Sequence, residues 1–368
     1  MVRRNREWKL FLDLCAPLSH EIEDLPTDDE WRRMLSRLEQ TRFGALAYHN
    51  LRARGLEDAV PAQVMAHLRA EHAQALARYH LLGEMVSPHL EALAREVDLL
   101  VLKGTAWAHT VYAKPHLRQS GDIDLLVRAE DQECAGRALE ARGFEGSWAC
   151  GDGHGPQFAL AVPHAGVVYV ELHPLLGRGM DHPHIDPEAA WARRTAVSLW
   201  GCHYGTPGND VGVAHVAAQV VGDMYSRSYV RYLVDLPYLV EARDVSSSDL
   251  TDLLTTGGLC GAAHCTAALA MCYVPLPRPR LAARLATRVV IALGLRTGPG
   301  VADGCGGTLI RLAALMLFDR HRDRRRRVRS YLRHARDRRT QRARDRRSTL
   351  DGALCIGAHR GQLTRVRA

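Results

Sequence analysis

The chain has 368 residues, of which 46% are hydrophobic and 24% are charged, an ordinary composition for a soluble globular protein. This length allows two or three units with cores of their own. The longest apolar run, residues 257–277, is rich in Gly and Ala and is interrupted by His264, and Lys9 and Asp13 break the apolar run at the N-terminus. Composition therefore argues against a membrane span and against a secretion signal. We expect a cytoplasmic protein with no membrane partner.

The net charge of +8 is unevenly distributed along the chain. Residues 319–347 hold 15 Arg and 4 Asp, a local charge of +11, so the remainder of the chain carries −3. A basic segment of this kind can bind nucleic acid through phosphate contacts, which makes nucleic acid a candidate partner. The alternative is a solvated, partly helical tail, because runs of like charge extend and repel one another.

The first predicted region, residues 1–95, is helical. Apolar residues at helical spacing predict a long helix over residues 62–96, and Pro88 is expected to break or kink it. The acidic residues Asp28 and Asp29 ahead of Trp31 indicate an earlier helix start.

The second predicted region, residues 96–186, is a small mixed α/β core. Its β-branched and Leu-rich runs and its helical patterns alternate. They predict a strand at 97–104, a helix at 105–113, a strand at 122–127, a helix at 130–142 and a hairpin of strands at 157–163 and 167–173. The predicted fold class is therefore α/β (α+β), with a small mixed sheet between helical regions.

The third predicted region, residues 187–335, is again helical, apart from a short β-like piece at 196–208. Helices are expected at 187–195, 209–225, 227–243, 248–255, 259–272, 280–294 and 308–335. Residues 336–368 form a basic, low-complexity tail that we expect to be disordered.

The strand at 122–127, DIDLLV, carries two aspartates in an apolar run. Residues two apart on a strand share a face, so Asp122 and Asp124 present two carboxylates side by side. Burying either one unpaired is costly. A hard divalent cation such as Mg²⁺, or Mn²⁺, would compensate the charge. The alternative is capping of backbone N–H groups near Ser120, or pairing with Arg118.

Two neighbouring motifs favour the metal interpretation. Lys103, Gly104 and Thr105 end one predicted strand and open a helix, whose free N–H groups suit phosphate. Glu171 adds a third carboxylate from another strand, and His173 shares its face. A phosphate cradle with three carboxylates is typical of metal-assisted phosphoryl or nucleotidyl transfer.

These motifs, LVLKGTAWAHTVYAKPHLRQSGDIDLLV (100–127) and VELH (170–173), resemble the uncharacterised nucleotidyltransferase-like family of the DNA polymerase β superfamily. A weaker echo is RYLVDLPYLV at 231–240, and the resemblance covers about residues 60–335. It implies a nucleotidyltransferase fold in which a small mixed sheet is flanked by helices.

The resemblance also implies roles for individual residues. Asp122 and Asp124 match the metal-binding aspartates, and Glu171 stands where the superfamily has a third acid that helps to activate the acceptor hydroxyl. The implied nucleotide-binding residues are Lys103, Gly104, Thr105, Arg118 and Ser120. Two residues depart from the pattern: Thr105 replaces the usual Ser, and Glu171 replaces the commoner Asp.

The sequence therefore predicts an Mg²⁺-dependent enzyme that moves NMP, most simply AMP, from a nucleoside triphosphate to a hydroxyl of a small molecule, a tRNA or a protein. Two alternative functions remain. The longer side chain of Glu171 is compatible with a catalytically degenerate nucleotide-binding or partner-binding module. The Arg-rich segment is compatible with a toxin-like transferase that acts on RNA.

Three further features receive structural interpretations. The motif MDHPHID at 180–186 lacks further ligands at zinc spacing and is read as a surface cluster. His215 lies among apolar residues and is predicted to be a packed core histidine. Asp235 is predicted to pair with Arg231, four residues before it.

Overall fold

The computed structural model describes residues 2–148, 155–177, 185–223, 229–242, 245–274, 276–277, 279–297, 313–314 and 316–317. These residues belong to one compact unit, Met1–Arg320, and a second unit comprises His321–Ala368. The Arg-rich segment 319–347, the tail 336–368, the predicted helix 308–335 except for four residues, and most of the 180–186 motif lie outside the described residues.

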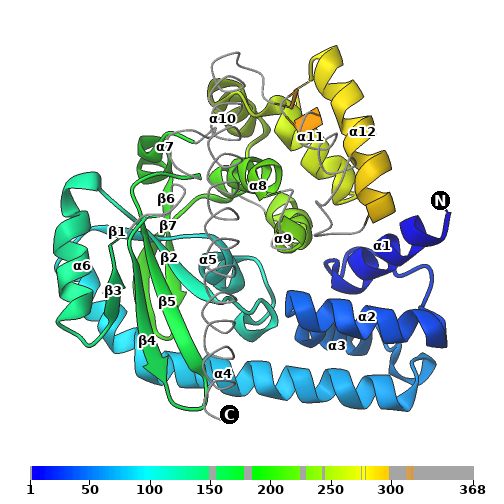
Figure 1. The fold of residues 1–368 in the computed structure, drawn as a ribbon, viewed down its shortest axis with the longest axis horizontal. Helices are drawn as coiled ribbons and strands as arrows, with labels where there is room; N and C mark the ends of the chain where they lie inside the picture. Colours follow the sequence, from blue (N-terminus) through cyan, green and yellow to red (C-terminus); the bar gives the residue numbers. More distant parts are fainter. Residues whose placement is uncertain are drawn as a thin grey trace, which may run out of the picture. The chain divides into compact units, whose positions relative to one another are not determined.

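The N-terminal region is helical, as the sequence predicted, and consists of α1 (Val2–Cys15), α2 (Asp28–Thr41), α3 (Gly44–Ala53) and α4 (Ala62–Ala94). The helix α4 continues through Pro88, so no break occurs there. Val86, Leu90 and Leu93 on either side of the proline are buried against the sheet, and this packing holds the helix where propensity alone would end it. Figure 1 shows α4 passing from the N-terminal helices to the sheet.

A seven-stranded mixed sheet, in the order β3-β4-β5-β2-β1-β7-β6, confirms the predicted fold class. Its strands are β1 (Leu99–Val101), β2 (Asp122–Val127), β3 (Glu145–Ser147), β4 (Gln157–Val162), β5 (Gly166–His173), β6 (Arg194–Leu199) and β7 (Cys202–Pro207). The strand β2 pairs antiparallel with β1 and parallel with β5. The two predicted core strands and the hairpin therefore meet in the middle of the sheet.

The sheet extends beyond the region in which the sequence indicated it. The sequence predicted only a short β-like piece at residues 196–208, among helices. In the structure this piece forms the hairpin of β6 and β7, and β7 pairs parallel with β1. A Cβ at Gly205 would lie 2.6 Å from Leu100 Cδ2, so a residue without a side chain allows this close pairing. The short edge strand β3 was not predicted either.

The two faces of the sheet pack against different helices. Ile123, Leu125 and Val127 point into an apolar cluster with the second half of α4 and with α6 (Gln132–Glu140). Leu126 belongs to a second cluster, which is shared with α5 (Lys103–Thr110), α8 (Asn209–Asp223) and α9 (Tyr229–Glu241). Because side chains alternate along β2, Asp122 and Asp124 share the face of Leu126. The acidic residues therefore face α5, α8 and α9.

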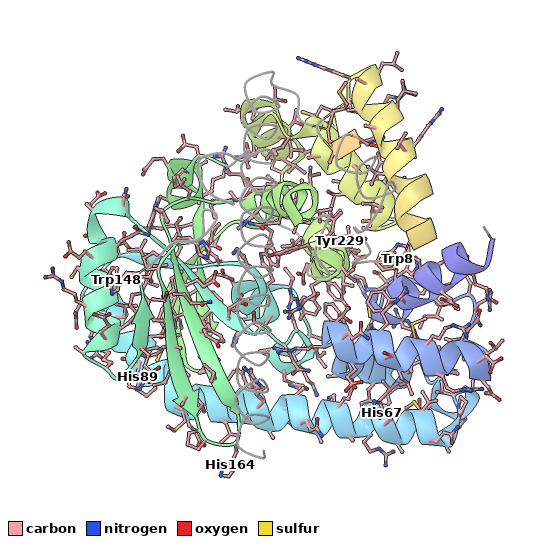
Figure 2. The ribbon with its side chains drawn as sticks, viewed as in Figure 1. Trp8, His67, His89, Trp148, His164 and Tyr229 are labelled. Atoms are coloured by element: carbon pink, nitrogen blue, oxygen red, sulfur yellow. The ribbon has the colours of Figure 1, made fainter. Side chains whose placement is uncertain are left out.

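The remaining helices are α7 (Pro187–Ala192), α10 (Ser247–Gly257), α11 (Cys260–Leu269) and α12 (Leu281–Thr297). Trp8, labelled in Figure 2, donates a 3.0 Å hydrogen bond from Nε1 to the carbonyl of Leu269 and thereby ties α1 to the end of α11. Among the residues described, no helix combines the length and hydrophobicity needed to cross a membrane.

Candidate active site

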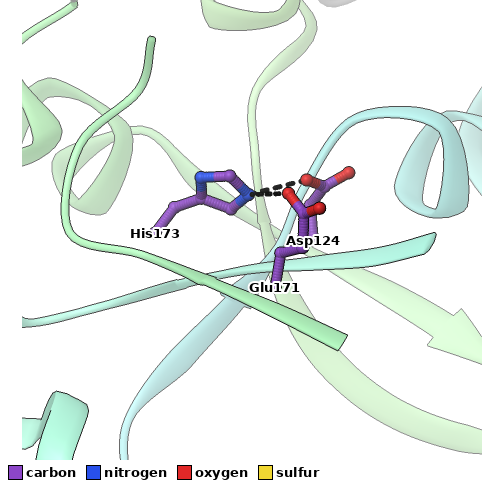
Figure 3. A group of neighbouring side chains, drawn as sticks. All are labelled: Asp124, Glu171 and His173. Carbon is purple, nitrogen blue, oxygen red and sulfur yellow. Dashed lines mark hydrogen bonds and ion pairs between the residues drawn. The ribbon is translucent and has the colours of Figure 1, made fainter. Parts of the chain in front are cut away.

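Two neighbouring parallel strands bring the acidic residues together. Asp124 on β2 lies opposite Glu171 on β5, and Leu126 lies opposite His173. Partners in such a pair point to the same face of the sheet. Asp124, Glu171 and His173 can each direct one ligand atom so that all three atoms lie within 4.8 Å of one another. Figure 3 shows the imidazole of His173 directed at both carboxylates.

Hydrogen bonds fix the orientation of this group. His173 Nε2 lies 2.7 Å from Asp124 Oδ1 and 3.4 Å from Glu171 Oε2. Gln157 Nε2 donates to Glu171 Oε1 at 2.8 Å, which turns the longer acid towards Asp124. Burial lowers the pKa of His173, but its bonds to the two carboxylates outweigh burial, and the pKa is raised. The buried imidazole therefore bridges the two acids, and its bonds to them favour its protonated form.

Lys103 provides a second positive charge at the same carboxylate. Its Nζ donates to Asp124 Oδ1 at 2.7 Å. Burial opposes ionisation of both groups, but their mutual attraction outweighs it, so the pKa of Lys103 is raised and that of Asp124 falls well below its usual range. Lys103 also adopts a φ of 52°, in the left-handed region that favours glycine. A strained backbone at the first residue of α5 is typical of functional sites.

Asp122 lies in a less favourable environment than Asp124. Ser120 Oγ donates to Asp122 Oδ1 at 3.2 Å, and Thr105 Oγ1 donates to the Asp122 carbonyl at 3.2 Å. The negative charge of Asp124, followed by burial, raises the pKa of Asp122. The repulsion between the two aspartates is therefore incompletely balanced, and a cation between them would relieve it.

The predicted metal ligands are thus only partly gathered into one cluster. Asp124 and Glu171 converge, as expected, and Asp122 lies close enough to interact electrostatically with both. His173, which the sequence noted only for its shared face, completes the closest group in place of Asp122. A His two residues after the acid on the same strand is the signal that could have identified it.

The predicted nucleotide-binding residues surround the aspartates. A Cβ at Gly104 would lie 3.1 Å from Ser120 Oγ and 3.2 Å from both terminal nitrogens of Arg118, so only glycine fits here without a shift. Thr105 is buried against the start of β2. The start of α5 is therefore pressed against the turn that precedes Asp122.

Arg118 is held by an acid other than the two aspartates of β2. Its Nε and Nη2 donate to Asp235 Oδ1 and Oδ2 at 2.6 and 2.7 Å, and its Nη1 donates to the carbonyl of Gln119. Tyr112 Oη donates to Asp235 Oδ1 at 2.8 Å. The alternative interpretation, in which Arg118 pairs with an aspartate of the DIDLLV strand, is therefore wrong, and the implied role of Arg118 in nucleotide binding stays a prediction.

The predicted pairing of Asp235 with Arg231 is also wrong. Asp235 uses both oxygens for Arg118 and Tyr112, whereas Arg231 donates to the carbonyl of Gln119. Helical spacing brings Arg231 near Asp235, but the bidentate geometry of Arg118 gives the stronger pair. A partner 117 residues away leaves no local signal in the sequence.

His215 on α8 is a packed core histidine, as the sequence predicted. It is 3% exposed, and its Nε2 lies 3.0 Å from Gln219 Nε2. Burial, reinforced by the charge of Lys103, lowers the pKa of His215 to about 3, so it is neutral at ordinary pH. It therefore contributes a polar wall behind Lys103 without adding charge.

The chain also matches a known protein family over the region that contains this site. Residues 27–275, more than half of the chain, match the family described as uncharacterised nucleotidyltransferase. The chain belongs to this family. The match begins earlier and ends earlier than the stretch in which the sequence showed the resemblance, and it includes all of the site residues named above.

Solved structures gave two weaker likenesses. The solution structure of the antibiotic-resistance factor ANT(2″)-Ia is 13% identical, with 49% of this chain and 91% of that chain covered and a TM-score of 0.32. An antigenic nucleotidyltransferase-like protein from Paracoccidioides brasiliensis is 16% identical, with 52% and 92% covered and a TM-score of 0.29. A comparison with curated proteins gave no match.

Proposed function

We propose that the protein transfers a nucleoside monophosphate, most simply AMP, from a nucleoside triphosphate to a hydroxyl group of an acceptor, with release of pyrophosphate. The observation that carries this proposal is the convergence of Asp124, Glu171 and His173 beside Asp122, whose pKa is raised by the neighbouring carboxylate. Membership of a nucleotidyltransferase family supports the reaction class.

The donor set fits a divalent cation. Asp122, Asp124 and Glu171 offer carboxylate oxygens, which Mg²⁺ prefers, and the imidazole of His173 is a ligand that Mn²⁺ also accepts. The repulsion between the aspartates is the physical reason for a cation there. Such an ion, when bound, would neutralise charge on the transferred phosphoryl group.

The remaining roles fall to the chain's own residues. In the transfer, the acceptor oxygen forms a bond to the α-phosphorus, the bond from that phosphorus to the bridging oxygen breaks, and pyrophosphate leaves with the electron pair. Glu171 takes the proton of the acceptor hydroxyl. Backbone N–H groups at Gly104 and Thr105 bind phosphate oxygens at the start of α5, and Ser120 steadies Asp122.

Lys103 balances the charge of Asp124 when substrate is absent, and we assign it a further role in offsetting charge on the leaving group. Its ammonium lies 3.5 Å from His173 Nε2, and both groups contact Asp124 Oδ1. The charge of Lys103 disfavours protonation of His173, and a negatively charged substrate would offset that charge. This arrangement supports an anionic substrate at the site.

Glu171 supports an active rather than a degenerate site. The extra methylene of Glu could misplace its carboxylate, but Gln157 and His173 hold the two oxygens and direct the group towards Asp124. This orientation supports catalysis, and the variants described next test the non-catalytic alternative.

Pyrophosphate release tests the proposal. The full chain would be incubated with each of the four nucleoside triphosphates and candidate acceptors, with Mg²⁺ or Mn²⁺, and compared with Asp122→Asn and Glu171→Gln. We expect metal-dependent release that both variants reduce strongly. Glu130→Gln, on an exposed acid beyond the end of β2, is the matched control and should release pyrophosphate like the wild type. Equal release by all variants would contradict the proposal.

A further inference from the structure

Three arginines from separate helical elements converge on the turn that precedes Asp122. Arg78 on α4 donates from Nη1 to the carbonyl of Ser120 at 3.4 Å. Arg231 on α9 donates to the carbonyl of Gln119. Arg42, at the end of α2, places Nη1 3.2 Å from the position that a Cβ of Gly121 would occupy. We call Arg42, Arg78 and Arg231 the arginine cluster.

The charges of the arginine cluster are only partly balanced by neighbouring acids, since Asp235 and Asp122 favour the charged form of Arg231 without an ion pair. Within the part of the chain that the structure describes, none of the three forms an ion pair, and Arg231 Nε is buried without a hydrogen-bond partner. Asp235 is nearby, but Arg118 and Tyr112 engage both of its oxygens. Elsewhere around the site, buried cations do have carboxylate partners, as Lys103 has Asp124.

The three cations also repel one another. Burial, followed by the charge of Arg118, lowers the pKa of Arg231 to about 9, and Arg42 contributes in the same direction. Burial and then Arg42 lower the pKa of Arg78. Gathering unpaired guanidinium groups in this way costs stability in the free protein, and a bound anion would recover it.

One member of the arginine cluster, Arg78, lines a cavity beside the proposed reaction centre. Arg78, Ser120, Gly121 and Asp122 line one cavity of about 50 Å³ together with Thr105. The glycine at position 121 leaves the space that the Arg42 guanidinium uses. Arg42 itself adopts a φ of 60° at the end of α2, a conformation in which glycine is favoured. An anion in contact with these groups would therefore lie directly beside Asp122.

We propose that Arg42, Arg78 and Arg231 bind the β- and γ-phosphates of the nucleoside triphosphate, so that the N-terminal helices α2 and α4 and the C-terminal helix α9 supply the leaving-group subsite. This inference rests on the proposed function. Planar guanidinium groups match phosphate oxygens in geometry and charge. The acidic residues of β2 would then lie beside the reacting end of the same substrate, where a bound cation would offset the like charges.

Binding of inorganic tripolyphosphate, measured by calorimetry without any acceptor, tests the subsite independently of catalysis. We expect Arg42→Gln and Arg78→Gln each to weaken binding about 10-fold to 100-fold. Arg32→Gln, on the exposed surface of α2, is the matched control and should bind like the wild type. Because repulsion is relieved, the double variant Arg42→Gln/Arg78→Gln should be at least as thermally stable as the wild type.

The outcomes separate this inference from the proposed function. Loss of tripolyphosphate binding without any detectable nucleotide transfer would support the subsite and count against the reaction. Nucleotide transfer with an unchanged KM for the triphosphate in both single variants would overturn the subsite. Weaker binding of a single-stranded RNA with unchanged binding of tripolyphosphate would also overturn it, since the arginines would then serve a nucleic acid. A loss of thermal stability in the double variant would instead indicate a structural role and overturn the proposal.

Discussion

Two buried groups of charged side chains lie close together in this protein, and they differ in how their charges are balanced. In the first, Arg118 and Asp235 form a bidentate pair, and Tyr112 adds a third hydrogen bond. Arg118 is 4% exposed and Asp235 is fully buried. We call this group the Arg118 lock. Its charges cancel and its hydrogen bonds are satisfied, which is the arrangement expected of a structural contact between the residue that follows η2 (Pro115–Leu117) and α9.

In the second group, the charges are less evenly matched. Lys103 contacts Asp124, His173 contacts Asp124 and Glu171, and Arg231 acts on Asp122 only from a distance, so the charge of Asp124 raises the pKa of Asp122. The comparison teaches that burial of charge does not itself identify a functional site. A balanced pair stabilises the fold, whereas an imbalance that the protein maintains indicates a missing ligand of the opposite charge.

The largest effect is expected for a variant that alters the acidic group and leaves the Arg118 lock intact. Asp122→Asn should reduce nucleotide transfer on the order of 10³-fold, because it removes a carboxylate from the reacting centre. The same change removes a repelling charge, so the free energy of unfolding should stay constant or rise. Pyrophosphate release and urea unfolding on the same preparation check both parts. A loss of activity that follows a loss of stability would count against this interpretation.

The next largest effect is expected for a variant that disrupts the Arg118 lock. Asp235→Asn leaves a buried guanidinium without its carboxylate and should lower the free energy of unfolding by about 3–5 kcal/mol. Asp249→Asn, on the N-terminal turn of α10, offers a control at a helix end away from both groups. A cost below about 1 kcal/mol, measured by urea unfolding, would show that the lock is not a stabilising contact.

Two neutral histidine side chains next to the Arg118 lock are expected to make the stability of the fold depend on pH. His116 Nε2 lies 3.1 Å from His72 Nε2, and burial, followed by the positive charges around it, lowers the pKa of His116 to about 4. An unfolded chain binds this proton near pH 6.5, so stability is constant above that pH and falls as the pH drops towards 4. We expect His116 to account for a loss of about 2 kcal/mol at pH 5.

Unfolding of wild type and His116→Gln at pH 7 and pH 5 measures this contribution. Glutamine keeps a hydrogen-bonding side chain but has no proton to gain, so the variant should lose less stability between the two pH values. Parallel losses in both proteins would show that His116 does not cause the dependence.

The smallest effect tests the third hydrogen bond of the lock. Tyr112→Phe removes one donor to Asp235 while Arg118 keeps both contacts, and the free energy of unfolding should fall by about 1 kcal/mol. Nucleotide transfer per folded molecule should not change. A large loss of activity at full stability would place Tyr112 in the reaction rather than in the lock.

Sequence patterns predicted local features well and distant partners poorly. Alternation in DIDLLV predicted β2 and the shared face of its aspartates, and the runs at 157–163 and 167–173 predicted the hairpin that carries Glu171. The partner of Arg118 could not be found in this way, because Asp235 lies far along the chain and only tertiary packing joins them. The sequence did not predict that the hairpin β6–β7 belongs to the sheet for a similar reason, since its place beside β1 depends on a long-range pairing.

The arginine cluster illustrates the same limit at the site itself. Arg42 and Arg78 lie in helices that read as a separate N-terminal region, and nothing in their local sequence points to Asp122. The closest acidic group also differs from the expected one, since His173 rather than Asp122 completes it. The residue types predicted the kind of chemistry, but the fold determined which acidic, histidine and arginine residues lie together at the site.

Binding of Mn²⁺, followed by the loss of its electron paramagnetic resonance signal on binding, tests the central claim most directly. The wild type should bind Mn²⁺, more tightly in the presence of a non-hydrolysable nucleoside triphosphate. Asp122→Asn should lose most of this binding while remaining folded, and Asp235→Asn should retain it at temperatures where it is folded. Equal binding by wild type and Asp122→Asn would contradict the claim that the unbalanced acidic group is a metal-dependent reaction centre.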